Sequence, residues 1–151
     1  MSSAALKAIC PFIDPEERFV ANLEDGSGFS ATLTELRSSS TPGRGAVWVV
    51  ISTSFHGGHA KTFTITFEQG KLEAITSITD DDDSVDLFYN DYSVPSNPTL
   101  QKAKSGSIQY KLDLNTLNFS GRFNAPIEKS DGSGTYMCNG EFNTQLSRSP
   151  E

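Results

Sequence analysis

The sequence predicts an all-β protein, an antiparallel β-sandwich of about eight or nine strands. Three observations support this fold class. Apolar and polar residues alternate with a period of two from Arg18 onward, short turns separate the alternating segments, and helical periodicity is nearly absent. Parallel strands need long crossover connections, so the short turns favour an antiparallel arrangement. The alternative is a closed up-and-down β-barrel, because a strand set of this size either packs as two sheets or closes on itself.

The first predicted strands alternate around one hairpin and then give way to a strongly apolar segment. Residues 18–24 place Phe19, Ala21 and Leu23 on one face, residues 25–28 form a turn, and residues 29–33 return. Residues 38–45 are rich in serine and glycine and are expected to form a flexible loop. Residues 46–55 hold Val-Trp-Val-Val-Ile in succession, which predicts a central strand covered on both faces and favours the sandwich over the barrel.

The middle of the chain continues the alternation up to a run of aspartates. Residues 57–58 form a glycine turn, and residues 61–68 alternate phenylalanine or isoleucine with threonine, which predicts a half-buried strand. Residues 71–79 change phase partway, which indicates a bulge. After the aspartates, residues 85–89 form a further alternating strand.

The last third has the clearest pattern. Residues 93–105 have no period and are expected to form a long loop. Residues 108–114, 119–123 and 136–142 then alternate regularly, and the turn at 131–134 precedes the last of them.

The 151 residues are enough for one domain, and we expect it to span residues 17–146, with an N-terminal arm at 1–16 and a tail at 147–151. Nineteen acidic against twelve basic residues give a net charge of −7. This charge argues against a nucleic-acid partner, because nucleic-acid binders cluster lysine and arginine against phosphates. No apolar run approaches the roughly 20 residues that span a membrane.

The N-terminal segment does not fit a signal peptide, because its apolar stretch is short and is interrupted by Lys7. A native N-terminus would therefore indicate a cytoplasmic protein, whereas removal of a leader would leave the compartment open. Cys10 and Cys138 allow one disulfide or two separate thiols, and the thiols are favoured.

The first candidate site is a pair of histidines around a glycine turn. His56 and His59 could direct both imidazoles at one metal ion, and imidazole is a common ligand for zinc, copper or nickel. No further ligand lies nearby in the sequence, so the competing interpretation is a hairpin tip with two solvated histidines.

The second candidate is the run Asp80, Asp81, Asp82 and Asp83. Clustered carboxylate oxygens suit calcium, so this run makes calcium a candidate cofactor, although the sequence establishes none firmly. The run lacks the glycine and the terminal glutamate of a helix–loop–helix calcium loop. Adjacent carboxylates repel one another, so a solvated loop that protects a strand edge is the competing interpretation.

The third candidate is the segment Tyr89, Asn90, Asp91 and Tyr92. Aromatic faces combined with short polar side chains hold sugars in many sandwiches, by stacking and directed hydrogen bonds. The same four residues also fit an ordinary strand end with an Asx turn.

Catalysis has little support, because neither a nucleophile elbow nor a metalloprotease helix motif is present, and no catalytic residue is assigned. We therefore expect a non-enzymatic binding module that contacts a protein, a glycan or a small molecule through loops at one end, with dependence on a cation or a carbohydrate. The alternative is a carrier of small apolar ligands, with phenylalanines lining a barrel cavity. The oligomeric state does not follow from the sequence.

Overall fold

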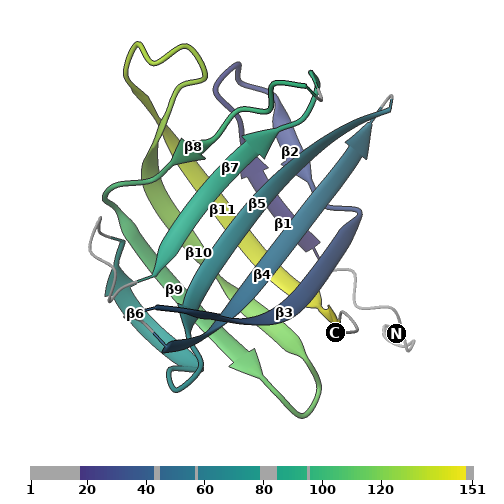
Figure 1. The fold of residues 1–151 in the computed structure, drawn as a ribbon, viewed down its shortest axis with the longest axis vertical. Helices are drawn as coiled ribbons and strands as arrows, with labels where there is room; N and C mark the ends of the chain where they lie inside the picture. The colour runs from purple at the N-terminus through teal and green to yellow at the C-terminus, as the bar shows by residue number, and fades with distance from the viewer. Residues whose placement is uncertain (1–17, 43–44, 57, 79–84, 95, 149–151) are drawn as a thin grey trace, which may run out of the picture.

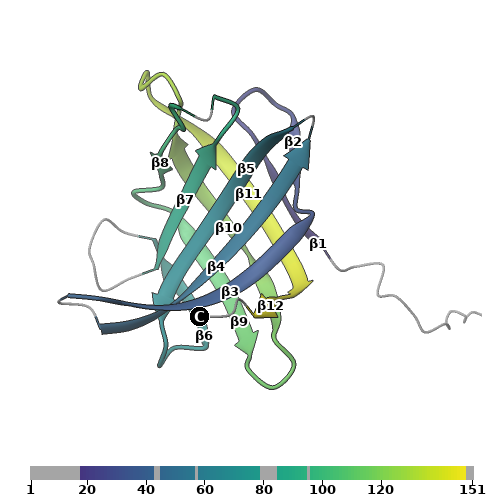
Figure 2. The same ribbon diagram turned by 45° about the vertical axis from the view of Figure 1, so that its right-hand side comes forward.

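The computed structural model describes residues 18–42, 45–56, 58–78, 85–94 and 96–148. These residues form no helix and fold into two six-stranded sheets that pack face to face. In Figure 1 the strands of the front sheet cross those of the rear sheet, and Figure 2 shows the same two layers after a turn of 45°. The predicted sandwich is confirmed. The described strands do not close into a single barrel, since each sheet keeps its own two edges.

The first sheet has the order β2-β1-β11-β10-β9-β6, and all its pairs are antiparallel. Its long β10–β11 hairpin is the centre of the sheet, with eleven residue pairs in register. The strands are β1 (Arg18–Asn22), β2 (Gly28–Ser30), β6 (Glu73–Ser77), β9 (Ser107–Asp113), β10 (Asn118–Glu128) and β11 (Thr135–Gln145).

The second sheet has the order β12-β3-β4-β5-β7-β8, and only the short β12–β3 pair is parallel. The β4–β5 hairpin is its centre and ends at a projecting tip at the upper right of Figure 1. The strands are β3 (Leu33–Thr41), β4 (Gly45–His56), β5 (His59–Glu68), β7 (Asp86–Asp91), β8 (Gln101–Lys102) and β12 (Ser147–Arg148).

The core lies between the sheets and is rich in aromatic rings. Seven phenylalanines and two tyrosines take part in ring contacts whose centroids lie 4.4 to 6.5 Å apart. Alternating residues of both sheets supply them, as expected for sheets that bury one face each. These phenylalanines are Phe19, Phe29, Phe63, Phe67, Phe119, Phe123 and Phe142.

Most expected strands are present, and the main error is the loop expected at residues 38–45. Strand β3 continues to Thr41, and its three serines at 38–40 pair in register with β4. Backbone hydrogen bonding to a strong central strand therefore overrides the weak strand propensity of serine. The expected loop at 93–105 contains the two-residue strand β8.

The alternation also changes phase where the chain leaves one sheet for the other. The Ala31 amide still donates to Phe19 O, whereas the next amide, of Thr32, donates to Thr53 O in the second sheet. Leu33, expected on the buried face, is consequently 40 % exposed, and Leu36 is buried instead.

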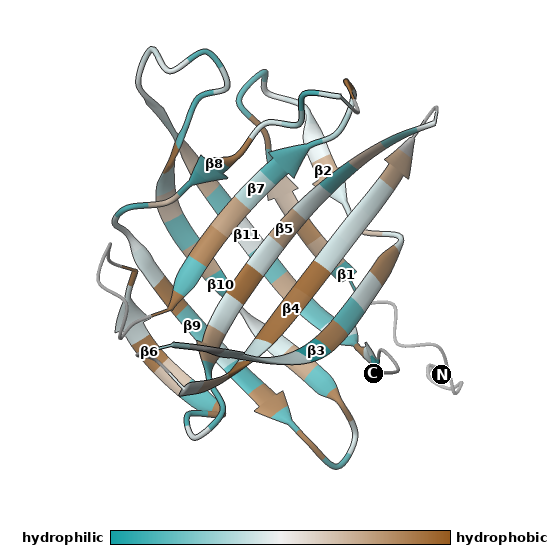
Figure 3. Cartoon of the chain, viewed as in Figure 1, coloured by the Kyte–Doolittle hydropathy of each residue, from teal (hydrophilic) through white to brown (hydrophobic). Residues whose placement is uncertain are grey.

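The apolar strand β4 occupies an interior position in its sheet, as expected, but the described part of the chain does not cover it on both faces along its length. Trp48 and Val50 face the core, while Val49 and Ile51 on the outer face are half-buried. Figure 3 shows apolar residues recurring along β4 and a more regular alternation along β10 and β11.

Candidate functional site

The predicted histidine pair lies at the tip of the β4–β5 hairpin. His56 and His59 form the last register pair of the two strands, and the His59 side chain is exposed. The His56 side chain lies outside what the structure describes. Within the described part of the chain, no group of three or more His, Cys, Asp and Glu side chains is arranged to hold a metal ion.

The predicted tyrosine segment forms the end of β7, and its side chains separate into buried and exposed ones. Tyr89 is buried, with its ring 4.9 Å from that of Phe63, and burial together with the charge of Asp91 raises the pKa of its hydroxyl. The Asn90 amide nitrogen donates to Thr99 O at 2.9 Å. Of the four residues, Tyr92 is the most exposed, at 37 %.

Asp91 forms the Asx turn that the competing interpretation expects. Its Oδ1 accepts hydrogen bonds from the Ser93 backbone amide at 2.9 Å and from the Ser93 hydroxyl at 2.6 Å. The Tyr92 amide donates to Ala60 O at 2.8 Å, which ties this turn to the β4–β5 hairpin. Tyr92 and His59 are thus brought to the same end of the sandwich.

The four aspartates at 80–83 lie outside the described residues. The residues that flank them, Ile78 and Val85, form an isolated bridge just before β7 begins. Tyr92 follows the other end of this six-residue strand, so β7 separates the attachment points of the two candidate sites by its whole length.

A hollow of about 530 Å³ lies at the end of the sandwich that carries Tyr92 and His59. We call it the rim hollow. It is bounded by β2 and the turn before it, the residue just before β3, the projecting part of the β4–β5 hairpin and the segment just after β7. Five hydroxyl side chains line it, together with His59, Lys61 and Phe55. The hydroxyl residues are Ser27, Ser30, Thr32, Ser54 and Ser93.

Three of these hydroxyls already donate their protons within the protein. Ser27 Oγ donates to Asp25 at 2.6 Å, Thr32 Oγ1 to Thr53 O at 3.1 Å, and Ser93 Oγ to Asp91. Each oxygen keeps lone pairs for a further donor. The rim hollow therefore offers several oriented acceptors, while Lys61 supplies a donor.

Two acidic groups, Asp25 and Asp91, accept hydrogen bonds from serines that line this hollow. For Asp25 the bonds also affect its ionisation. The hydroxyl and amide of Ser27 donate to its carboxylate, and these hydrogen bonds lower the Asp25 pKa, with a smaller effect from the Lys61 charge. The carboxylate is thus fixed in its charged form beside the hollow.

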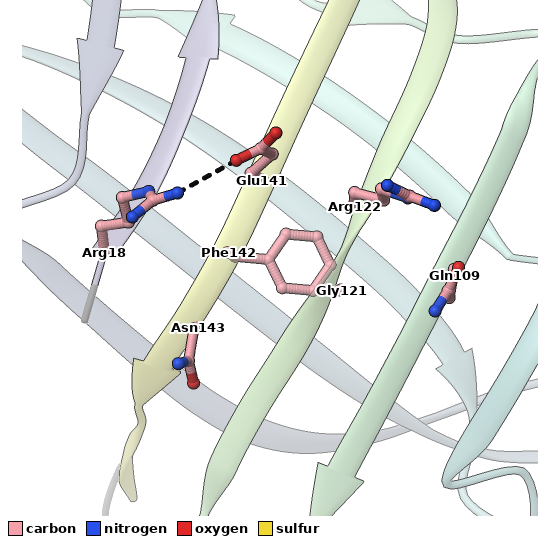
Figure 4. A pocket seen from close by; sticks show the side chains of 7 residues that line it. All are labelled: Arg18, Gln109, Gly121, Arg122, Glu141, Phe142 and Asn143. Carbon is pink, nitrogen blue, oxygen red and sulfur yellow. Dashed lines mark hydrogen bonds and ion pairs between the residues drawn. The ribbon is translucent and has the colours of Figure 1, made fainter. Parts of the chain in front are cut away.

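A second hollow of about 440 Å³ lies on the outer face of the first sheet, over β1, β11, β10 and β9. We call it the sheet hollow. Figure 4 shows Arg18 and Glu141 joined by an ion pair, whose Nη2–Oε1 distance is 3.0 Å, and Arg122 extending from β10 toward Gln109 on β9. Both arginines and Gln109 are exposed.

The backbone of Gly121 lines the bottom of the sheet hollow. Its φ is +149°, and a Cβ at this position would lie 1.9 Å from Gln109 O. A side chain cannot occupy this place without separating β9 from β10. The close approach of the two strands therefore requires glycine here.

Sequence reasoning missed Ser54, Lys61, Gln109 and Arg122 as site residues. Ser54 and Lys61 are register partners on the β4–β5 hairpin, and Gln109 and Arg122 are partners on β9 and β10. Single polar residues on alternating strands look alike in the sequence, and only the pairing register brings them together.

The described structure defines a β-sandwich protein in which Cys138 is a free, buried thiol, while Cys10 lies outside the described residues. Comparison with protein-family models, curated proteins and solved structures gives no match. No helix within the described ranges has the length and apolar character needed to cross a membrane.

Proposed function

We propose that this protein is a non-enzymatic binding module that holds a polyhydroxylated ligand at the rim hollow. The observation that carries the proposal is the convergence of five hydroxyl side chains with Lys61 and His59 in one hollow of about 530 Å³. These groups come from loops and strand ends at one end of the sandwich, the usual place for binding residues on a rigid β-scaffold.

The hydrogen-bonding pattern supports a ligand that both donates and accepts. The oxygens of Ser27, Thr32 and Ser93 are acceptors for ligand hydroxyls, because their own protons are used within the protein. The Lys61 ammonium donates to ligand oxygens. A sugar, with many hydroxyls that each donate and accept, matches this arrangement.

Exposed aromatic surface at the same end supports a sugar in particular. Phe55 is 60 % exposed and pairs with Ala60, whose carbonyl oxygen accepts the Tyr92 amide. The apolar C–H face of a sugar packs on such rings.

The alternative function, a carrier of small apolar ligands, has less support. It needs phenylalanines that line a cavity, whereas the seven core phenylalanines contact one another or the core tyrosines. An apolar-dye displacement assay tests this alternative directly.

The test of the proposal is a screen of neutral and acidic glycans, followed by titration of the best one against two variants. We expect Lys61→Gln to weaken binding at least tenfold, because it removes the ammonium from the rim hollow. Lys71→Gln, which changes an exposed lysine outside the rim hollow, serves as the matched control and should keep the affinity within twofold. A screen without any bound glycan, or equal affinity of both variants, contradicts the proposal.

Cation dependence is tested separately by following thermal unfolding with millimolar calcium and then with EDTA. An ion that binds the native state at Asp80–Asp83 raises the unfolding midpoint. An unchanged midpoint of thermal unfolding would exclude calcium binding to the native protein and would leave the sugar proposal intact.

A further inference from the structure

The outer face of the first sheet presents a row of side chains that run straight across four strands. In register, Glu141 on β11 lies opposite Arg122 on β10, which lies opposite Gln109 on β9, and Ile75 on β6 comes next. Residues directly opposite one another in antiparallel strands are near neighbours. The row therefore forms one continuous surface at the sheet hollow.

Of the two charged side chains in this row, one forms an ion pair within the described part of the chain and the other does not. Glu141 lies opposite Arg122, yet its carboxylate pairs with Arg18 at 3.0 Å. Among the residues that the structure describes, Arg122 has no ion-pair or hydrogen-bond partner for its side chain. Figure 4 shows it extended toward Gln109, away from Glu141. The donor groups of the Arg122 guanidinium are therefore available to a ligand, next to the side-chain amide of Gln109.

We propose that Arg122 and Gln109 form a second ligand site, which takes the carboxylate of a uronic-acid-containing oligosaccharide. A guanidinium group binds a carboxylate through two parallel hydrogen bonds, and the Gln109 amide adds a donor and an acceptor beside it. This site stands on the first sheet and does not depend on the rim hollow.

The surroundings favour a sugar acid over an acidic peptide. A third hollow, of about 350 Å³, lies next to the sheet hollow. It shares Arg122, Gln109 and Glu141 with the sheet hollow and adds Asn124 and Asn139. Asn124 Nδ2 donates to Asn139 Oδ1, so the Asn124 amide oxygen and the Asn139 amide nitrogen are left as acceptor and donor for ligand hydroxyl groups. One common way for a peptide to bind a sheet is to add a strand at a free edge, and this way is closed here because β9, β10 and β11 are each paired on both sides.

Gly121 keeps the carboxylate position accessible. Its backbone lines the bottom of the sheet hollow, and a Cβ added at this position would collide with Gln109 O, so no side chain occupies this place. A ligand carboxylate can therefore approach the sheet beside Arg122 and Gln109.

The test is calorimetric titration of the whole protein with an oligogalacturonate, at low and at high salt. We expect Arg122→Gln to weaken binding at least tenfold and Gln109→Ala to weaken it several-fold, with the wild-type affinity falling as salt rises. Arg37→Gln removes an exposed arginine from the outer face of the other sheet and should keep the affinity within twofold. Unchanged thermal midpoints show that these variants are folded.

Four results would overturn the inference. They are the absence of oligogalacturonate binding, equal affinity of Arg122→Gln and the wild type, equal affinity for the carboxyl-reduced oligosaccharide, and equally tight, Arg122-dependent binding of a polyglutamate peptide. Lys61→Gln separates the two proposals. It should keep the Arg122-dependent binding of oligogalacturonate, whatever it does to binding at the rim hollow, and a loss of that Arg122-dependent binding in Lys61→Gln would assign the acidic sugar to the rim hollow instead.

Discussion

The two sheets bury similar inner faces but present different outer faces. On the first sheet, the outer residues of the central strands are amides and charged groups such as Gln109, Arg122 and Glu141. On the second sheet, Val49 and Ile51 lie outward beside a row of threonines on β5. The inner faces of both sheets consist of alternating large apolar residues.

This difference shows that different physical requirements determine the residue types on the inner and outer faces of a strand. Inner positions must fill the core, so they are apolar in both sheets. Outer positions of β4 and β5 carry β-branched residues, which favour extended backbone and half-cover one another without a further layer. The outer face of the central strands of the first sheet carries mainly polar and charged groups instead.

The largest effect on stability is expected at Gly121, where β9 and β10 approach each other closely. Gly121→Ala should destabilise the protein by about 3 kcal/mol or more, because its Cβ would meet Gln109 O at 1.9 Å and its φ of +149° disfavours any side chain. Gly70→Ala, where nothing lies within 4 Å, is the control and should change stability by no more than about 0.5 kcal/mol. Urea unfolding measures both, and similar midpoints would show that β9 and β10 can separate at little cost.

The contrast between inner and outer faces can be measured with one residue type on adjacent strands. Ile65 on β5 is fully buried, whereas Ile51 on β4 faces outward and is half-buried. We expect Ile65→Ala to cost about 2–4 kcal/mol, since it leaves a cavity, and Ile51→Ala to cost about 1 kcal/mol. Equal losses in chemical denaturation would mean that a further layer covers the outer face of β4.

The sequence predicts the inner faces well because burial imposes a local pattern. The alternation of Phe63, Ile65 and Phe67 gave strand β5, and that of Ile108, Tyr110 and Leu112 gave β9. The strand at Ser38–Ser40 could not be predicted, since it forms only because β4 supplies a complete ladder beside it. Exposure at Leu33 depends on the point where the chain changes sheets.

The candidate sites were harder to predict, because strand pairing and strand phase decide which side chains meet and neither is a local pattern in the sequence. Residue type alone makes His59 and Tyr92 candidates, and both lie at one end of the sandwich. Residue type also makes Tyr89 a candidate, yet the strand phase turns its ring into the core against Phe63. Arg122 and Gln109 are thirteen residues apart in the chain, and their pairing depends on the register of β9 with β10.

A buried phenol provides a smaller effect that depends on pH. Tyr110 donates from its hydroxyl to Lys71 O at 2.7 Å, and burial, assisted by the Glu68 charge, raises its pKa to about 12. Between about pH 10, the pKa of an unfolded tyrosine, and pH 12, the unfolded chain loses this proton first, so stability falls as pH rises. Burial also raises the pKa of the Cys138 thiol to about 12, which adds to the loss.

Tyr110→Phe should therefore cost about 1 kcal/mol at neutral pH, through the lost hydrogen bond, and reduce the fall in stability between pH 10 and 12. Urea unfolding at pH 7, 10 and 11.5 measures both effects. Tyr92→Phe, in which the altered side chain is exposed, controls for the loss of a hydroxyl at neutral pH. An alkaline fall that stays as steep in Tyr110→Phe would exclude this phenol as its source.

The smallest effect on stability is expected on the polar outer face, where binding should respond instead. Glu141→Gln breaks the exposed ion pair with Arg18 and should cost less than about 1 kcal/mol, because such pairs are screened by solvent. The same change removes the negative charge opposite Arg122. It should tighten oligogalacturonate binding several-fold at low salt, with a smaller gain at high salt, as titrations at both salt concentrations would show. Weaker binding by Glu141→Gln would mean that the carboxylate orients the site rather than opposing its ligand. A large loss of stability would mean that the outer face of the first sheet supports the fold as well.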